Sequence, residues 1–205
     1  YPQRRGDSVR YYAQALEIHR KVENRPEAAE TLTRMGRLCR AKRALYEASK
    51  YHHEALEIWR SLGNRRNVAL ELRLLAAVFR EEIAALSEDG ATYVQMDDVP
   101  LPMLCDENVR GQLEIVGIDA SQLLDDYIKL FNDSLRGSPT SVTTAIHLCR
   151  GNYKGHFLSD GGYEDVAEKM FNELQTDAFF MEYDTPRAGD FEPLRFVPPD
   201  KVVVL

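Results

Sequence analysis

Cysteine is scarce in this chain: only three of its 205 residues are cysteines, at positions 39, 105 and 149. Their irregular spacing does not fit a disulfide framework, so the sequence predicts a protein of the reducing cytoplasm. Long apolar runs are also missing, and no signal peptide is visible, so we expect no membrane partner. The remaining composition, 44% hydrophobic, is sufficient for one large or two small domains.

Charge of the two signs is divided unevenly along the chain. Residues 1–80 carry 17 Lys and Arg against 9 Asp and Glu, and residues 81–205 carry 9 against 24, which together give the net charge of −7. This asymmetry predicts two modules, 1–80 and 81–205. The basic half does not indicate a nucleic-acid partner, because its arginines are spread around predicted helices with little aromatic interleaving.

The first module contains an internal repeat. Residues 15–20 (ALEIHR) return forty positions later as residues 55–60 (ALEIWR). A period of this length with helical apolar spacing predicts a solenoid of helix pairs, with helices at about 7–21, 27–41, 45–61 and 66–86. The stretch resembles tetratricopeptide repeats, which implies a peptide or protein partner in a concave groove. A plain scaffold or spacer is the alternative.

The second module alternates strand and helix patterns. The sequence predicts strands at about 92–97, 142–148, 177–183 and 201–205 and helices at about 118–135 and 163–174. Four strands with helical crossovers amount to half of a (β/α)8 (TIM) barrel, so the predicted fold is a partial barrel (α/β) preceded by an all-α segment. We expect Pro100 and Pro102 to shape an irregular connection. No linker separates the modules, which predicts one continuous helix across their boundary.

A candidate metal site follows two of these strands. His147 and Cys149 are two residues apart, so on a strand both side chains point to the same face. Glu182 is expected at the same end of the next parallel strand. An imidazole, a thiolate and a carboxylate are three of the four ligands of a tetrahedral zinc. The alternative for the pair is a core histidine beside a buried cysteine. His156 has no partner at ligand spacing, and His52 and His53 are expected on the surface of a repeat helix.

Three motifs carry a family resemblance: residues 147–152 (HLCRGN), 161–168 (GGYEDVAE) and 182–196 (EYDTPRAGDFEPLRF). They resemble the catalytic domain of cobalamin-independent methionine synthase and its relatives, over roughly residues 79–205. In that family a His-x-Cys, a later Glu and a distant Cys hold a zinc that binds the acceptor thiol. The resemblance implies that His147, Cys149 and Glu182 bind Zn2+.

The same resemblance implies a reaction, the transfer of a methyl group from a 5-methyltetrahydrofolate-type donor to a thiol such as homocysteine. Asp97, with Asp98 as its neighbour, would be the acid that faces the active site and holds the amino group of the substrate, as a catalytic and substrate-binding residue. The alternative for this pair of acids is a helix N-cap or a turn. Glu182 would also lie against the substrate. Tyr183, Arg187 and Asp190 are candidates for substrate contacts or for supporting the ligands. Their alternative is a salt-bridged loop.

Two functional hypotheses remain open. The chain begins at Tyr1, ends in an apolar run and has no cysteine after Cys149, where the family has its last ligand. It therefore resembles a fragment of the methyltransferase, expected to be inactive or weak alone. The alternative is a protein-interaction module whose repeats act while the barrel piece is vestigial or artificially joined.

Overall fold

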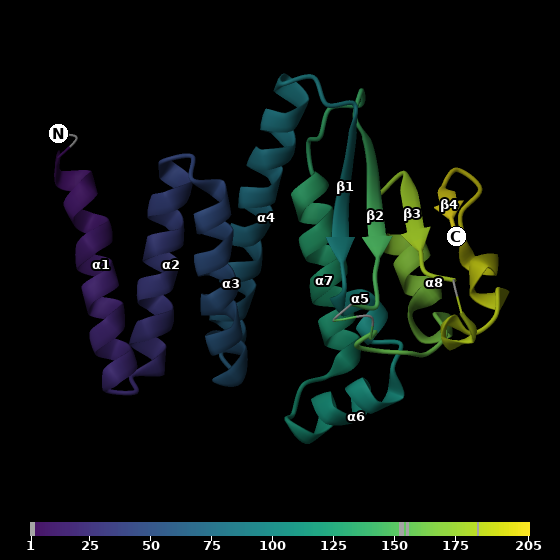
Figure 1. The fold of residues 1–205 in the computed structure, drawn as a ribbon, viewed down its shortest axis with the longest axis horizontal. Helices are drawn as coiled ribbons and strands as arrows, with labels where there is room; N and C mark the ends of the chain where they lie inside the picture. Colours follow the sequence, from purple (N-terminus) through teal and green to yellow (C-terminus); the bar gives the residue numbers. More distant parts are fainter. Residues whose placement is uncertain (1–2, 152–153, 155, 184) are drawn as a thin grey trace. The chain divides into compact units, whose positions relative to one another are not determined.

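The computed structural model describes residues 3–151, 154, 156–183 and 185–205 (Figure 1). The chain divides into two compact units, Tyr1–Glu82 and Ile83–Leu205. The division lies inside one helix, α4 (Arg65–Glu88), which also contains the boundary predicted between residues 80 and 81. None of the helices in the described ranges is long and apolar enough to cross a membrane.

The first unit is entirely helical in its described part. Its helices are α1 (Gln3–Lys21), α2 (Arg25–Ala41), α3 (Leu45–Ser61) and α4. The four helices predicted from the apolar periodicity are confirmed, and no strand lies between residues 3 and 82 of the described chain. Asn24 caps α2, because its side chain accepts a hydrogen bond from the backbone N–H of Glu27.

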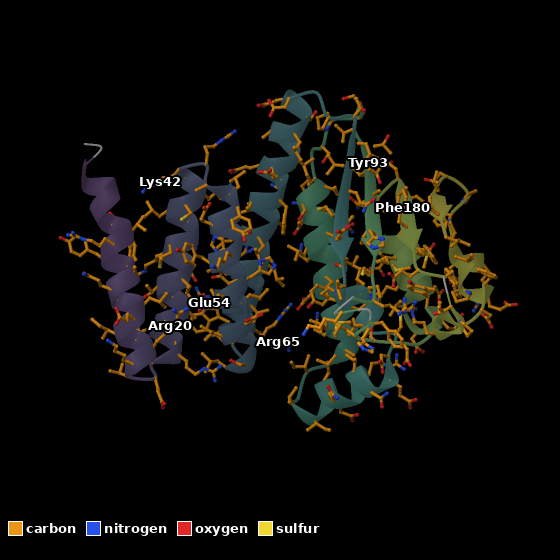
Figure 2. All side chains as sticks on the ribbon, viewed as in Figure 1. Arg20, Lys42, Glu54, Arg65, Tyr93 and Phe180 are labelled. Atoms are coloured by element: carbon orange, nitrogen blue, oxygen red, sulfur yellow. The ribbon has the colours of Figure 1, made fainter. Side chains whose placement is uncertain are left out.

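The repeated segments provide the core of this unit. Its central cluster contains Leu16, Ala28, Ala29, Leu32, Met35, Ala55 and Trp59. At the surface, Arg20 of α1 forms an ion pair with Glu54 of α3 (Figure 2). The tetratricopeptide identity and a peptide partner remain predictions.

A polar network is buried among these helices, and it corrects one prediction. His52 is fully buried, and its Nδ1 lies 2.7 Å from Oε2 of Glu71. The other oxygen of Glu71 accepts a hydrogen bond from the hydroxyl of Thr33 at 2.6 Å. The prediction of a surface His52 was wrong because Gly36 leaves room for the ring: a Cβ there would lie 2.5 Å from the His52 Nε2. His53 is exposed, as predicted.

The second unit is built on a four-stranded sheet. The strands are β1 (Tyr93–Asp98), β2 (Thr143–Leu148), β3 (Ala178–Met181) and β4 (Val202–Val204), adjacent in chain order and all parallel (Figure 1). The predicted strands and their parallel pairing are confirmed. β3 ends at Met181, so Glu182 lies just beyond the strand, and Asp184 lies outside the described residues.

Helices connect the first three strands. The connection from β1 to β2 contains α5 (Pro100–Met103), α6 (Glu107–Ile115) and α7 (Ala120–Leu135), and that from β2 to β3 contains α8 (Glu164–Glu173). The irregular connection expected at Pro100 and Pro102 is instead helical, because proline fits the first turn of a helix, where its missing N–H is not needed. Asp119 caps α7 by accepting hydrogen bonds from two backbone N–H groups.

One face of the sheet carries the core. The strand residues in the hydrophobic cluster alternate along the chain, so all of them lie on one face: Val94, Ile146, Leu148, Phe179 and Met181. The cluster also contains Leu124, Ile128 and Phe131 of α7 and Val166, Met170 and Phe171 of α8. Short 3-10 helices, η1 (Pro186–Ala188) and η2 (Glu192–Phe196), precede β4. Strands in chain order with helices on one face are typical of a (β/α)8 barrel, while a doubly wound sheet has helices on both faces. The barrel itself remains a prediction.

Candidate metal centre

Strand register brings the three predicted ligands to one place. β2 and β3 pair His147 with Phe180 and Leu148 with Met181. Continuing this register by one residue sets Cys149 level with Glu182. The side chains of His147, Cys149 and Glu182 then all belong to the face opposite the core, at the carboxyl ends of two neighbouring strands.

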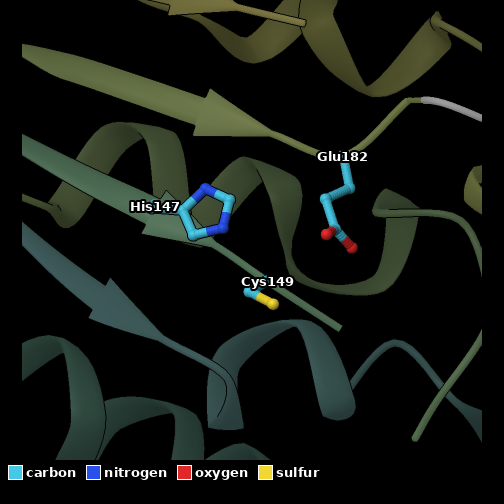
Figure 3. A group of neighbouring side chains, drawn as sticks. All are labelled: His147, Cys149 and Glu182. Carbon is cyan, nitrogen blue, oxygen red and sulfur yellow. The ribbon is translucent and has the colours of Figure 1, made fainter. Parts of the chain in front are cut away.

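The donor atoms lie close enough to share an ion. One ligand atom from each of His147, Cys149 and Glu182 lies within 4.8 Å of the other two, and all three residues are partly buried. Figure 3 shows the three side chains around a shared space at the ends of β2 and β3. Around a tetrahedral zinc with bonds of about 2.0–2.3 Å, donor atoms are about 3.3–3.8 Å apart. Side-chain movements of about 1 Å would therefore bring the three donor atoms to the separations of a tetrahedral zinc site. Nitrogen, sulfur and oxygen are also the donor atoms that zinc prefers.

Backbone and side-chain donors surround the two acidic ligands. The N–H of Gly151 donates to Sγ of Cys149 at 3.3 Å, and the N–H of Arg150 donates to Oε2 of Glu182 at 3.0 Å. Nη2 of Arg187 lies 3.4 Å from the same carboxylate oxygen. These contacts hold the sulfur of Cys149 and the carboxylate of Glu182 in place.

The two neighbouring aspartates at the end of β1 have different environments. Asp97 pairs in register with His147, so it lies on the same face as the candidate ligands, and it is exposed. It is not one of the grouped donors. Asp98 lies on the opposite face, where its Oδ1 accepts a hydrogen bond from the N–H of Leu101 at 2.7 Å, and burial raises its pKa to about 6. Asp98 therefore binds the first turn of helix α5, and Asp97 lies on the face of the candidate ligands.

Among the three residues suggested after Glu182, Arg187 contacts a candidate ligand, with its Nη2 3.4 Å from Oε2 of Glu182. Tyr183 packs its ring between two other aromatic rings, and burial raises its pKa to about 12. Asp190 accepts a hydrogen bond from the N–H of Glu192 and so belongs to a turn. A role for Asp190 in substrate binding remains a prediction.

The segment that follows Gly151 is described only in part. Residues 152, 153 and 155 lie outside the described residues. His156 is exposed and is not part of the metal-binding group. In the described part of the chain, His147, Cys149 and Glu182 are the one group of three or more such side chains at metal-binding distance.

Sequence reasoning missed two residues beneath the site. Arg150 is completely buried, and its Nη1 donates to the backbone carbonyl of Glu182 at 3.0 Å. Tyr163, also completely buried, has its ring 4.3 Å from the guanidinium carbon of Arg150. In the sequence, Arg150 is an arginine shortly after an apolar strand, and an arginine in that place usually lies at the surface. The sequence pattern therefore did not predict its burial.

Comparisons with known proteins give relatives for part of the chain. No protein-family model matches it. Two uncharacterized proteins of Bacillus subtilis strain 168, YxjG and YxjH, are each 34% identical to it over 123 residues, which are 60% of this chain and 32% and 33% of those proteins. The chain thus spans about a third of the length of these curated relatives.

One solved structure is also similar. It is a protein of Listeria monocytogenes provisionally described as a vitamin-B12 independent methionine synthase. The match covers 70% of this chain and 38% of that chain, at 27% identity and a TM-score of 0.48.

Proposed function

We propose that the second unit is the zinc-binding part of a (β/α)8-barrel methyltransferase that moves a methyl group from a methylated folate to a thiol such as homocysteine, in methionine biosynthesis. The observation that carries this proposal is the convergence of His147, Cys149 and Glu182, with donor atoms within 4.8 Å of one another. They follow the carboxyl ends of adjacent parallel strands, the end at which barrel enzymes place their chemistry. The three sequence motifs that resemble the methionine synthase family support the choice of reaction.

Three protein ligands with a remaining open position are typical of a catalytic zinc site. Bound there, zinc would supply the Lewis acidity that lowers the pKa of a coordinated substrate thiol. The chain's own groups would prepare that position. Cys149 and Glu182 would provide two negative charges that balance a divalent cation, and His147 a neutral nitrogen donor.

Asp97 would select an amino-acid thiol. It is exposed on the same face as the ligands and lies beside His147 in the sheet register. A carboxylate at this place could bind the protonated amino group of homocysteine and so direct the thiol toward the ligands. In the structure Asp97 accepts a hydrogen bond from Nε2 of Gln95 at 3.1 Å, which orients the carboxylate along the strand.

The experiment that tests the proposal measures thiol binding at the metal site. The chain is loaded with Co2+, a coloured substitute for zinc, and titrated with homocysteine, with ethanethiol, which lacks the amino group, and with homoserine, which lacks the thiol. We expect both thiols to increase the sulfur-to-cobalt charge-transfer absorption and homoserine to leave it unchanged. An absorption spectrum that no thiol alters would contradict the proposal.

A matched variant separates the role of Asp97 from that of the metal. Asp97→Asn should weaken homocysteine binding by about 10-fold, because a charged hydrogen bond contributes about 1.5–3 kcal/mol and this one is partly solvated. Binding of ethanethiol should not change. Equal weakening of both thiols would remove Asp97 from the substrate site while leaving the metal site in place.

A further inference from the structure

We infer that Arg150 is a positioning residue, which holds Glu182 where its carboxylate can join His147 and Cys149 around one ion. This inference rests on the proposed metal site and adds a residue to it. Arginine is rarely buried completely unless it is paired, yet Arg150 has 0% of its surface exposed. In the described part of the chain, no carboxylate forms an ion pair with its guanidinium.

The guanidinium binds backbone carbonyls instead. Nη1 donates to the carbonyl of Glu182 at 3.0 Å, and Nη2 donates to the carbonyl of Gly161 at 2.5 Å. The planar guanidinium fork thus connects two chain segments that no strand pairing joins. Its face lies over the ring of Tyr163, with 4.3 Å from the guanidinium carbon to the ring centre, which adds a cation–π contact.

Glu182 needs such support because it lies outside the sheet. β3 ends at Met181, so the ladder of strand hydrogen bonds no longer fixes the next residue. Arg150 and Tyr163 replace that ladder: the hydroxyl of Tyr163 accepts the N–H of Glu182 at 3.2 Å, and Arg150 holds its carbonyl. The backbone N–H of Arg150 also binds the Glu182 carboxylate at 3.0 Å. Both backbone polar groups of Glu182 and one of its ligand oxygens are therefore constrained.

The second anchor of Arg150 is rigid as well. Gly161 has a φ of +106°, and a Cβ on it would lie 2.4 Å from the carbonyl oxygen of Cys105. Its N–H donates to the carbonyl of Arg187 at 3.0 Å. The Gly161 carbonyl that accepts the hydrogen bond from Nη2 is thus held by close backbone packing. Arg150 therefore holds the Glu182 carbonyl at a fixed distance from a rigid part of the backbone.

A double-mutant cycle on zinc affinity tests the inference. Arg150→Lys keeps the positive charge but cannot reach both carbonyls with a planar fork. We expect it to weaken zinc binding by about 10–100-fold, as losing a supporting contact of a metal ligand usually does. Tyr163→Phe, which keeps the ring under Arg150 and removes the hydroxyl, should weaken binding in the same direction. Arg195→Met, at an exposed ion pair with Glu164, should bind zinc as the unaltered chain does.

The decisive comparison uses the Glu182→Gln background. If Arg150 acts through Glu182, Arg150→Lys causes little further loss of zinc affinity once Glu182 is replaced, because interacting residues are not additive. Equal losses in both backgrounds, or wild-type zinc affinity in Arg150→Lys, would overturn the inference. If Arg150→Lys does not fold, the same cycle with Tyr163→Phe decides it. Unchanged zinc affinity in Glu182→Gln alone would instead contradict the proposed function.

Discussion

Replacing Asp98 with asparagine should stabilise the second unit at neutral pH. The carboxyl lies on the core face of β1, and burial raises its pKa to about 6 from the ordinary value of 3.8. Asparagine keeps an oxygen that can accept the hydrogen bond from the N–H of Leu101, which the aspartate accepts at 2.7 Å. A pKa raised from 3.8 to about 6 corresponds to at most about 3 kcal/mol, and the partial exposure of Asp98 reduces the expected gain to about 1–2 kcal/mol.

The gain should depend on pH in a definite direction. Below about pH 3.8, the ordinary pKa of aspartate, the group is protonated in the folded and the unfolded chain, so the two proteins should be equally stable. Between about pH 3.8 and 6 the folded chain keeps its proton longer than the unfolded chain, and the stability of the unaltered protein falls as pH rises. Above about pH 6 the penalty is complete, and the advantage of Asp98→Asn reaches a plateau.

Amide hydrogen exchange of β1 and β2 peptides measures this stability, because the only tryptophan, Trp59, lies in the first unit and reports on that unit. Exchange is compared at several pH values across the titration of Asp98. The control is Asp97→Asn, an exposed neighbour expected to change stability by less than about 0.5 kcal/mol. A gain in stability for Asp98→Asn that does not vary with pH, or a loss of stability at pH 7.5, would contradict the claim that burial disfavours the ionised carboxyl of Asp98.

Two further predictions concern buried contacts. Glu71→Leu leaves Nδ1 of His52 buried without its hydrogen-bond partner and should destabilise the first unit by about 1–3 kcal/mol. Glu71→Gln, which keeps a hydrogen bond, should destabilise it less. Trp59 fluorescence during urea unfolding measures both variants, and equal effects would contradict the prediction. Gly161→Ala should destabilise the second unit by more than about 2 kcal/mol, because strain at positive φ adds to the contact with Cys105. Gly90→Ala, at φ +98° with nothing within 4 Å, should show the strain alone, so hydrogen exchange should give it the smaller loss.

Local patterns in the sequence were sufficient to predict most of the elements. The forty-residue repeat gave the helices of the first unit, and apolar β-branched runs gave the strands of the second. The parallel pairing followed because a helix between two strands implies a crossover. The helix α5 was missed, since Pro100 and Pro102 indicate a break unless their place in a first turn is known. The helix α6 was also missed, and it has no buried residue that would produce a strong apolar pattern.

The features that the sequence did not predict depend on contacts between residues far apart in the chain. His52 and Arg150 carry charged or polar groups that usually lie at the surface, and only their partners Glu71 and the carbonyl of Glu182 explain their burial. Asp97 and Asp98 are adjacent in sequence, so the strand pattern alone did not distinguish them, and the prediction that Asp97 faces the site came from the family resemblance. His147 and Cys149 were predictable as a pair because their spacing alone places them on one face.

X-ray absorption spectroscopy of the zinc-loaded chain identifies the atoms that bind the metal. We expect one Zn2+ per chain with one sulfur ligand at about 2.3 Å and nitrogen or oxygen ligands at about 2.0–2.2 Å. Cys149→Ser should remove the sulfur signal and most of the binding, while Cys39→Ser, which replaces a cysteine buried in the first unit, should keep both. A zinc site without sulfur, or a sulfur ligand that persists in Cys149→Ser, would contradict the metal site of His147, Cys149 and Glu182.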